Sequence, residues 1–325
     1  MPDFDMPMIA PQLQPDPSAC NFDLDAALNS VVSLQSKVPE NAYTAHVLGT
    51  ERAGHGVVIG EKGLILTIGY LVVEAETIWL VDHSGAAVPG HVAGYDHETG
   101  FGLVQALGHT SAPAIPLGSA ADLFEGDPIV VAGHGGRTGA IAGQVEEKRE
   151  FAGYWEYLLD QAIFTAPAHP NWGGTGLIGR DGKLLGIGSL FIQQGANERD
   201  STDGNMIVPI DLLKPIYEDM ITTGSVKRSP RPWLGLFGTE VEDHVVVAGL
   251  SEDGPSHQAG LEVGDVVLEV DGQSVHSLAD FLRTVWALGG AGVEVPLTIV
   301  RDEEALEARI ESINRADLLK RPRVH

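Results

Sequence analysis

The sequence is poor in positive charge, and this limits the partners that it can have. Its 325 residues hold 20 Lys and Arg against 45 Asp and Glu, which gives a formal net charge of −25. No Lys or Arg occurs between Lys62 and Arg137. Because such an acidic surface repels nucleic-acid phosphates and anionic lipids, we expect no nucleic acid and no membrane as a partner.

Cysteine and long apolar runs are also scarce. Cys20 is the only cysteine, so an intrachain disulfide is excluded. The longest apolar stretch, residues 63–73, is far shorter than the roughly 20 residues of a membrane-spanning helix. Residues 1–25 carry five Asp and no Lys or Arg, unlike a secretory signal peptide. We therefore expect a cytoplasmic protein, or a periplasmic one if its N-terminus was trimmed.

Glycine and proline, by contrast, are abundant. The 40 Gly and 19 Pro punctuate many short β-rich runs, which predicts a mainly β protein. The length favours two domains. We expect an extended or disordered segment, a first domain, a second domain and a basic tail, which cover residues 1–22, 23–225, 226–312 and 313–325.

Apolar periodicity and turn residues predict the main elements. Three segments have helical spacing: 23–35, 211–223 and 278–288. Nine β-rich runs are predicted as strands: 55–60, 64–67, 77–81, 129–132, 184–187, 245–248, 266–270, 295–300 and 306–310. The strands of the first domain predict a barrel or sandwich.

Several segments occur in the order that is typical of the HtrA/Deg family, and the chain resembles this family over roughly residues 50–312. The family joins a trypsin-like double β-barrel to one or two C-terminal PDZ domains. Its T-x-x-H-V-V segment resembles Thr67–Val72, its D-x-x-x-D segment resembles Asp96–Gly100, and its G-N-S-G-G-A-L loop resembles Asn171–Leu177. The following Asp181–Ile187 matches the family's N-G-x-L-I-G-I without a gap, which fixes the register.

The resemblance implies that all three residues of the catalytic triad are replaced. Tyr70 stands at the histidine position, Gly100 at the aspartate position and Gly173 at the serine position. A phenol with a pKa near 10 cannot act as a resting general base, and glycine has no functional group. Only an oxyanion hole at Asn171 and Gly173 would survive, so we predict a pseudo-protease with no catalytic residues.

Two hydroxyl side chains remain as alternative nucleophiles. Thr175 lies two residues after the expected serine position, although the downstream register opposes its use. Ser189 follows the strand 184–187 and is expected to be an ordinary strand residue. The twelve histidines show no paired metal-ligand spacing, so we expect no metal and no cofactor.

The second domain resembles a PDZ domain with one peptide site. Trp233, Leu234, Gly235 and Leu236 match the carboxylate-binding loop, whose backbone N–H groups hold a peptide C-terminus while the peptide pairs alongside. Leu236 is then expected to line the pocket for the last side chain, together with two residues of the helix 278–288, Phe281 and Val285. The alternative is that these apolar residues close the core.

We therefore predict a non-catalytic HtrA-like protein that binds polypeptide segments or C-termini. Its role would be that of an adaptor, a chaperone-like holder or a regulator of an active HtrA relative in protein quality control. The resemblance also implies a homo-oligomer, a trimer by analogy. An active endopeptidase that uses Thr175 and a purely structural assembly module stay open as alternatives.

Overall fold

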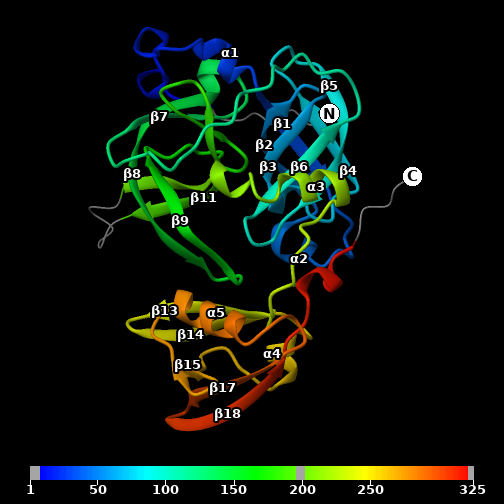
Figure 1. Ribbon diagram of the computed structural model, residues 1–325, viewed down its shortest axis with the longest axis vertical. Coiled ribbons are helices and arrows are strands. Elements are labelled where there is room, and N and C mark those ends of the chain that lie inside the picture. Colours follow the sequence, from blue (N-terminus) through cyan, green and yellow to red (C-terminus); the bar gives the residue numbers. More distant parts are fainter. Residues whose placement is uncertain (1–7, 195–201, 321–325) are drawn as a thin grey trace. The chain divides into compact units, whose positions relative to one another are not determined.

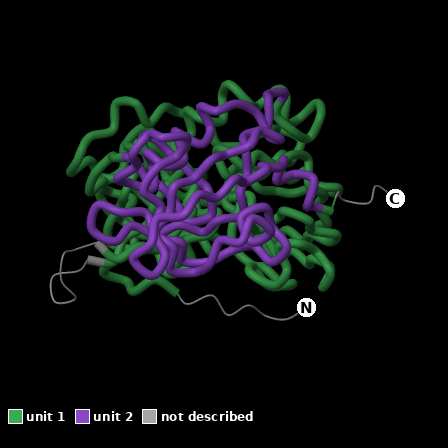
Figure 2. Tube along the Cα trace, turned by 90° about the horizontal axis from the view of Figure 1, so that it is seen from below, with its two compact units in different colours: residues 1–149, 161–226, 320–325 green, residues 150–160, 227–319 purple. Residues whose placement is uncertain are grey.

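The computed structural model describes residues 8–194 and 202–320, which form two compact units (Figure 2). The first unit holds the residues up to Arg149, those from Gln161 to Val226, and Lys320. The second holds residues 150–160 and 227–319. The outer parts of the predicted N-terminal segment and basic tail, 1–7 and 321–325, lie outside the described residues. No helix within the described residues is long and apolar enough to span a membrane.

Two closed β-barrels make up most of the first unit (Figure 1). The first has the strand order β1-β2-β3-β6-β5-β4 and the second the order β10-β11-β12-β9-β8-β7. Their strands are β1 (Val31–Lys37), β2 (Glu51–Gly60), β3 (Leu64–Ile68), β4 (Thr77–Val81), β5 (Ala87–Tyr95), β6 (Phe101–Ala106), β7 (Pro128–Ala132), β8 (Ala140–Gly153), β9 (Tyr157–Ala166), β10 (Gly176–Ile178), β11 (Leu184–Gln194) and β12 (Thr202–Pro209). Closure leaves no unpaired sheet edge in either barrel, and inward-facing apolar residues fill both cores.

The predicted helix over 23–35 is wrong beyond its first turn. Helix α1 covers only Leu24–Leu28, where the Asp23 carboxylate accepts the N–H of Ala26 at 3.0 Å. From Val31 the chain is strand β1, which pairs with both β2 and β4 and thereby closes the first barrel. The β-branched pair Val31 and Val32 suits a strand that is buried on both faces, so tertiary pairing overrides the helical spacing.

The predicted helix over 211–223 is interrupted. A 3₁₀ turn covers Ile210–Leu212, and helix α3 begins only at Tyr217 and ends at Thr223. Pro215 lies in the gap, because proline has no N–H to donate and disfavours helical geometry in the residue before it. The predicted stop is confirmed: Gly224 follows α3 with a left-handed φ of 74°.

The second unit consists mainly of one sheet and two helices. Together with the two barrels of the first unit, it confirms the predicted mainly β fold of a double barrel plus a PDZ-type domain. Its sheet has the order β13-β14-β15-β17-β18, and β16 pairs with β15. Its elements are β13 (Leu236–Val241), β14 (His244–Leu250), α4 (Pro255–Gln258), β15 (Val266–Val270), β16 (Gln273–Ser274), α5 (Leu278–Ala287), β17 (Glu294–Arg301) and β18 (Glu304–Glu311). Helix α5 starts where it was predicted, because the Ser277 hydroxyl caps the N–H of Asp280.

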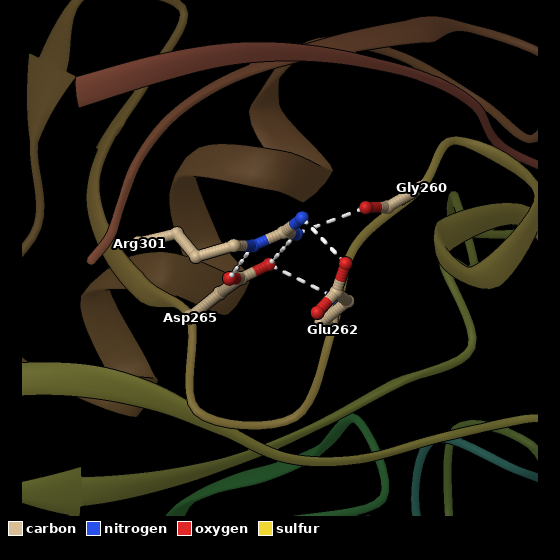
Figure 3. A network of polar contacts seen from close by, with 4 residues as sticks. All are labelled: Gly260, Glu262, Asp265 and Arg301. Atoms are coloured by element: carbon tan, nitrogen blue, oxygen red, sulfur yellow. Dashed lines mark hydrogen bonds and ion pairs between the residues drawn. The ribbon is translucent and has the colours of Figure 1, made fainter. Parts of the chain in front are cut away.

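A charged network closes the turn that leads into β15 (Figure 3). Arg301, at the end of β17, donates to both carboxylate oxygens of Asp265 at 2.6 and 2.7 Å, and to the carbonyl of Gly260 at 2.9 Å. The Asp265 side chain is buried and also accepts the N–H of Glu262 at 2.8 Å. Burial raises the pKa of this carboxyl, but the bonds from Arg301 and from the Glu262 N–H outweigh it, so the pKa is lowered.

This network predicts how the second unit responds to substitution and to acid. Asp265→Asn should lower the free energy of unfolding by about 2 kcal/mol, because it removes the buried carboxylate that binds the partly buried guanidinium of Arg301 through two hydrogen bonds. The folded state lowers the pKa of Asp265. The stabilisation that the Asp265 carboxylate contributes is therefore complete above its unfolded-state pKa, and it is lost as the pH falls from that value through the folded-state pKa. Urea unfolding followed by tryptophan fluorescence measures both effects.

The exposed partner of the same arginine provides a matched control. Glu262 accepts from Arg301 at 2.7 Å, but its side chain is 68% exposed. Glu262→Gln should therefore change the free energy of unfolding by less than about 1 kcal/mol. Equal effects of the two substitutions would contradict the assignment of Asp265 as the anchor of the network.

Candidate functional site

Tyr70 lies in a short 3₁₀ turn, Gly69–Leu71, that directly follows β3. Its hydroxyl donates to the carbonyl of Ser189 at 2.9 Å. The ladder between β11 and β12 shifts register between Gly188 and Leu190, so Ser189 lies at a bulge. Burial raises the pKa of the Tyr70 phenol above its usual range. At neutral pH this side chain is therefore a hydrogen-bond donor and not a base.

Gly173 lies directly against Tyr70. A Cβ atom at this glycine would be only 2.7 Å from the Tyr70 hydroxyl oxygen. The carbonyl of Gly173 accepts the N–H of His55, on β2, at 2.8 Å. The space that a side chain at position 173 needs is thus filled by the tyrosine.

Gly100 contacts the same turn through its carbonyl group. Its carbonyl accepts the N–H of Gly69, the residue before Tyr70, at 2.6 Å. Its φ of 78° is left-handed, a conformation that favours glycine. The structure therefore brings together the three residues that the resemblance assigns to the triad positions.

The backbone N–H of Asn171 is hydrogen-bonded to a buried side chain of the protein itself. Its N–H donates to Nδ1 of His169 at 3.1 Å, and Nε2 of the same ring lies 2.9 Å from the carbonyl of Gly139. These two partners require a neutral ring with its proton on Nε2. Burial lowers the pKa of His169, which agrees with the neutral form. One of the two N–H groups expected in an oxyanion hole is therefore occupied.

His55 is a buried residue whose role the sequence did not reveal. Its Nδ1 accepts the N–H of His134 at 3.1 Å, and its ring meets that of His169 edge-on, with centroids 5.8 Å apart. Burial, together with the neighbouring His169 and His134, lowers the pKa of His55 to about 3. The sequence shows His55 only as one residue of a glycine-rich strand. Its neutral ring supports the neighbouring loops from inside the core.

Thr175 and Ser189, the alternative nucleophiles, are both buried. The Thr175 hydroxyl donates to the carbonyl of Trp172 at 2.9 Å. A Cβ atom at Gly188 would lie 2.1 Å from this hydroxyl oxygen, so strand β11 covers it. A hydroxyl enclosed in this way cannot reach a substrate without local rearrangement.

The Trp233–Leu236 loop of the second unit binds a carboxylate of the chain itself. The N–H groups of Leu234, Gly235 and Leu236 donate to one oxygen of Glu156, at 3.1, 2.8 and 3.3 Å. Gly235 has a left-handed φ of 68°, which turns its N–H in the same direction as those of its neighbours. Neither composition nor spacing pointed to Glu156, which is 78 residues from Leu234 in sequence.

The three apolar residues predicted to line a peptide pocket are brought together. Leu236, Phe281 and Val285 are each 1% exposed and belong to the same core cluster of the second unit. Ala152 and Leu158, from the β8–β9 hairpin, pack against this cluster. Among the residues described here, no group of three or more His, Cys, Asp or Glu could hold a metal ion.

Comparisons with known proteins agree with this two-part architecture. Residues 54–187 match the model of a trypsin-like peptidase domain, and residues 232–311 match that of a PDZ domain. A probable periplasmic serine endoprotease DegP-like from Halomonas elongata is 28% identical over 77% of the chain and 54% of its own length. The serine endoprotease DegS from Escherichia coli is 23% identical over 90% of the chain and 85% of its own length. The chain thus spans about half the length of the DegP-like relative.

A solved structure has the same overall fold. The HtrA-type protease AlgW, solved with a decapeptide, superposes with a TM-score of 0.52 at 19% identity, over 92% of this chain and 99% of that one. The DegP-like relative is named as periplasmic. The compartment of this chain stays a prediction.

The contact between Tyr70 and Gly173 can be tested by a double-mutant cycle. Gly173→Ala should lower the free energy of unfolding by about 1–3 kcal/mol, because the new methyl group meets the Tyr70 hydroxyl. Tyr70→Phe should cost about 1 kcal/mol, because the carbonyl of Ser189 loses its donor. In the double variant the alanine should cost much less, since the ring carbons are at least 3.6 Å away. Strictly additive unfolding energies would show that the two residues do not touch.

Proposed function

The chain belongs to the HtrA family, in which a trypsin-like protease domain precedes a C-terminal PDZ domain, and we propose that it binds polypeptide C-termini without cleaving them. The observation that carries this proposal is the loop Trp233–Leu236, where three N–H groups converge on one carboxylate. A peptide C-terminus presents the same group to a PDZ domain.

The geometry of the barrel unit supports the absence of catalysis. Acyl transfer in this fold requires a nucleophile, an imidazole beside it and an oriented carboxylate. Here the Tyr70 hydroxyl occupies the space beside Gly173, and the N–H of Asn171 is bound to His169. An intact oxyanion hole alone gives only about 10³–10⁴-fold over water, which is negligible for amide hydrolysis. Thr175 is enclosed by β11, so its geometry does not favour the alternative of an active endopeptidase.

The edge of the sheet in the second unit supports peptide binding. Strand β13 begins at Leu236, directly after the loop, and within the described residues it pairs only with β14. Its other edge is available for a peptide strand that runs alongside while its C-terminus reaches the loop. Leu236, on β13, and Phe281 and Val285, on α5, are each 1% exposed in one core cluster, so they would contact the last apolar side chain of a ligand only after local rearrangement.

In this proposal the protein acts as an adaptor, a holder of unfolded chains or a regulator of an active HtrA relative. Each of these roles needs affinity for polypeptide ends and no turnover. Assembly into a homo-oligomer, a trimer by analogy with the family, would present several such sites at once and raise the apparent affinity for clustered ligands.

Absence of proteolysis can be tested directly. The purified chain should leave unfolded casein intact and should not react with a fluorophosphonate probe, with trypsin as the positive control. Labelling accompanied by casein cleavage would contradict the proposal. If such activity is lost in Thr175→Ala, the active endopeptidase is the correct interpretation.

Peptide binding needs a separate measurement. An array of fluorescein-labelled decapeptides, differing in their last residue, should show saturable anisotropy with the full chain for apolar C-terminal residues. The same peptides with a C-terminal amide should bind at least about tenfold more weakly, because the amide removes the charge that the loop holds. Equal binding of acid and amide would exclude the loop as the site.

A further inference from the structure

The tip of the β8–β9 hairpin has an unusual residue at its third position. Strand β8 ends at Gly153 and β9 begins at Tyr157, which leaves a loop of three residues. Glu156, the last of them, has a left-handed φ of 60°. Hairpin loops of this length commonly place a left-handed residue there, and glycine or asparagine fits it best. The left-handed backbone is strained for a glutamate, so the presence of this residue is to be explained by what its side chain contacts.

The side chain of Glu156 reaches the Trp233–Leu236 loop as a peptide terminus would. One carboxylate oxygen accepts three consecutive N–H groups, and the other lies 3.3 Å from the nitrogen of Leu234. Glu156 is half-buried as a residue, and the carboxyl group is its buried end. The site that the proposed function assigns to a ligand is therefore occupied by the chain itself.

Further contacts hold the hairpin tip, residues 150–160, within the second unit. The Tyr154 ring meets that of Phe237, on β13, edge-on with centroids 6.2 Å apart. Arg315 donates to the carbonyl of Trp155 at 3.2 Å. The exposed Arg283 of α5 pairs with Asp160 at 2.6 Å and with Glu150. The ion pairs are exposed, which suits a reversible docking, while Ala152 and Leu158 add apolar packing against the core cluster.

Resting on the proposed function, we propose that the hairpin tip is an internal competitor of the peptide ligand, with Glu156 as a substitute for its C-terminal carboxylate. A peptide can bind only when Glu156 leaves the loop. Two features keep the docked state displaceable. Glu156 has a strained backbone, which a peptide terminus does not have, and the docked hairpin tip is held in part by an exposed ion pair between Asp160 and Arg283.

Protonation gives the direction of a pH effect. Burial raises the pKa of the docked Glu156 carboxyl to about 7, although the charge of Arg315 and the N–H groups of the loop act against it. A released glutamate has an ordinary pKa near 4.3. The docked state therefore holds its proton more tightly, and raising the pH through this interval favours release. In the absence of peptide, the protection of the Leu234–Leu236 N–H groups from exchange, corrected for intrinsic exchange rates, should therefore fall from about pH 5.5 to about pH 8.

The experiment compares peptide binding by the full chain and its Glu156 variants. Glu156→Gly removes the carboxylate and relieves the left-handed strain, so the turn should be kept. Glu156→Gln keeps the shape and removes the charge. Both should bind the labelled apolar decapeptides about tenfold more tightly than the parent, because the fraction of open loop rises. The protection of their Leu234–Leu236 N–H groups should also lose the pH dependence. Glu147→Gln, which changes a carboxylate of β8 outside residues 150–160, is the matched control and should behave like the parent.

The outcomes separate this inference from the proposed function. If parent and Glu156 variants bind the same free-acid peptides with equal affinity, the loop is already open and the inference is wrong, while peptide binding stands. If none of them binds any peptide, the proposed function fails and the inference fails with it. Amide exchange at Leu234–Leu236 provides a second measurement, and it should be faster in Glu156→Gly than in the parent. Unchanged exchange would overturn the contact itself.

Discussion

Buried backbone polar groups need hydrogen-bond partners, and this constraint governs every candidate site in the chain. A protease cleft or a peptide loop works by leaving such groups free for its substrate. Here the carbonyl of Ser189 accepts from Tyr70, the N–H of Asn171 donates to His169, and the loop at Gly235 donates to Glu156. In each of these three places, the backbone group that would meet a ligand is hydrogen-bonded to a side chain of its own unit.

Some residues of these sites could be predicted from the sequence, and others could not. The positions of Tyr70, Gly100 and Gly173 followed from matched motifs, and the structure brings them together. Glu156 could not be found in the same way, because it belongs to no matched motif and a glutamate at φ 60° leaves no mark in composition or periodicity. The loop Trp233–Leu236 was matched as a motif, whereas its partner Glu156 lies outside every motif.

The fold shows the same division between local and long-range information. The strands Thr77–Val81 and Val266–Val270 were predicted with their observed bounds, because β-branched runs between turn residues are a local signal. The helix expected over 23–35 failed at Val31, where pairing with two distant strands closes a barrel. Strand β8 was missed, because its charged stretch around Lys148 hides the alternation on which strand prediction rests.

The two sites therefore differ in how tightly the side chain that occupies each of them is held. Tyr70 is neutral and buried, and it lies in a turn directly attached to β3, so no titration near neutral pH releases its hydroxyl from Ser189. Glu156 is strained and carried by a hairpin loop, and burial raises the pKa of its carboxyl group to about 7, within the physiological range. Removing the tyrosine from its place would require the barrel to repack, whereas removing the glutamate moves the hairpin tip and the contacts of Ala152 and Leu158 with the core cluster. Regulation by a ligand is thus physically accessible at the Trp233–Leu236 loop and not at Gly173.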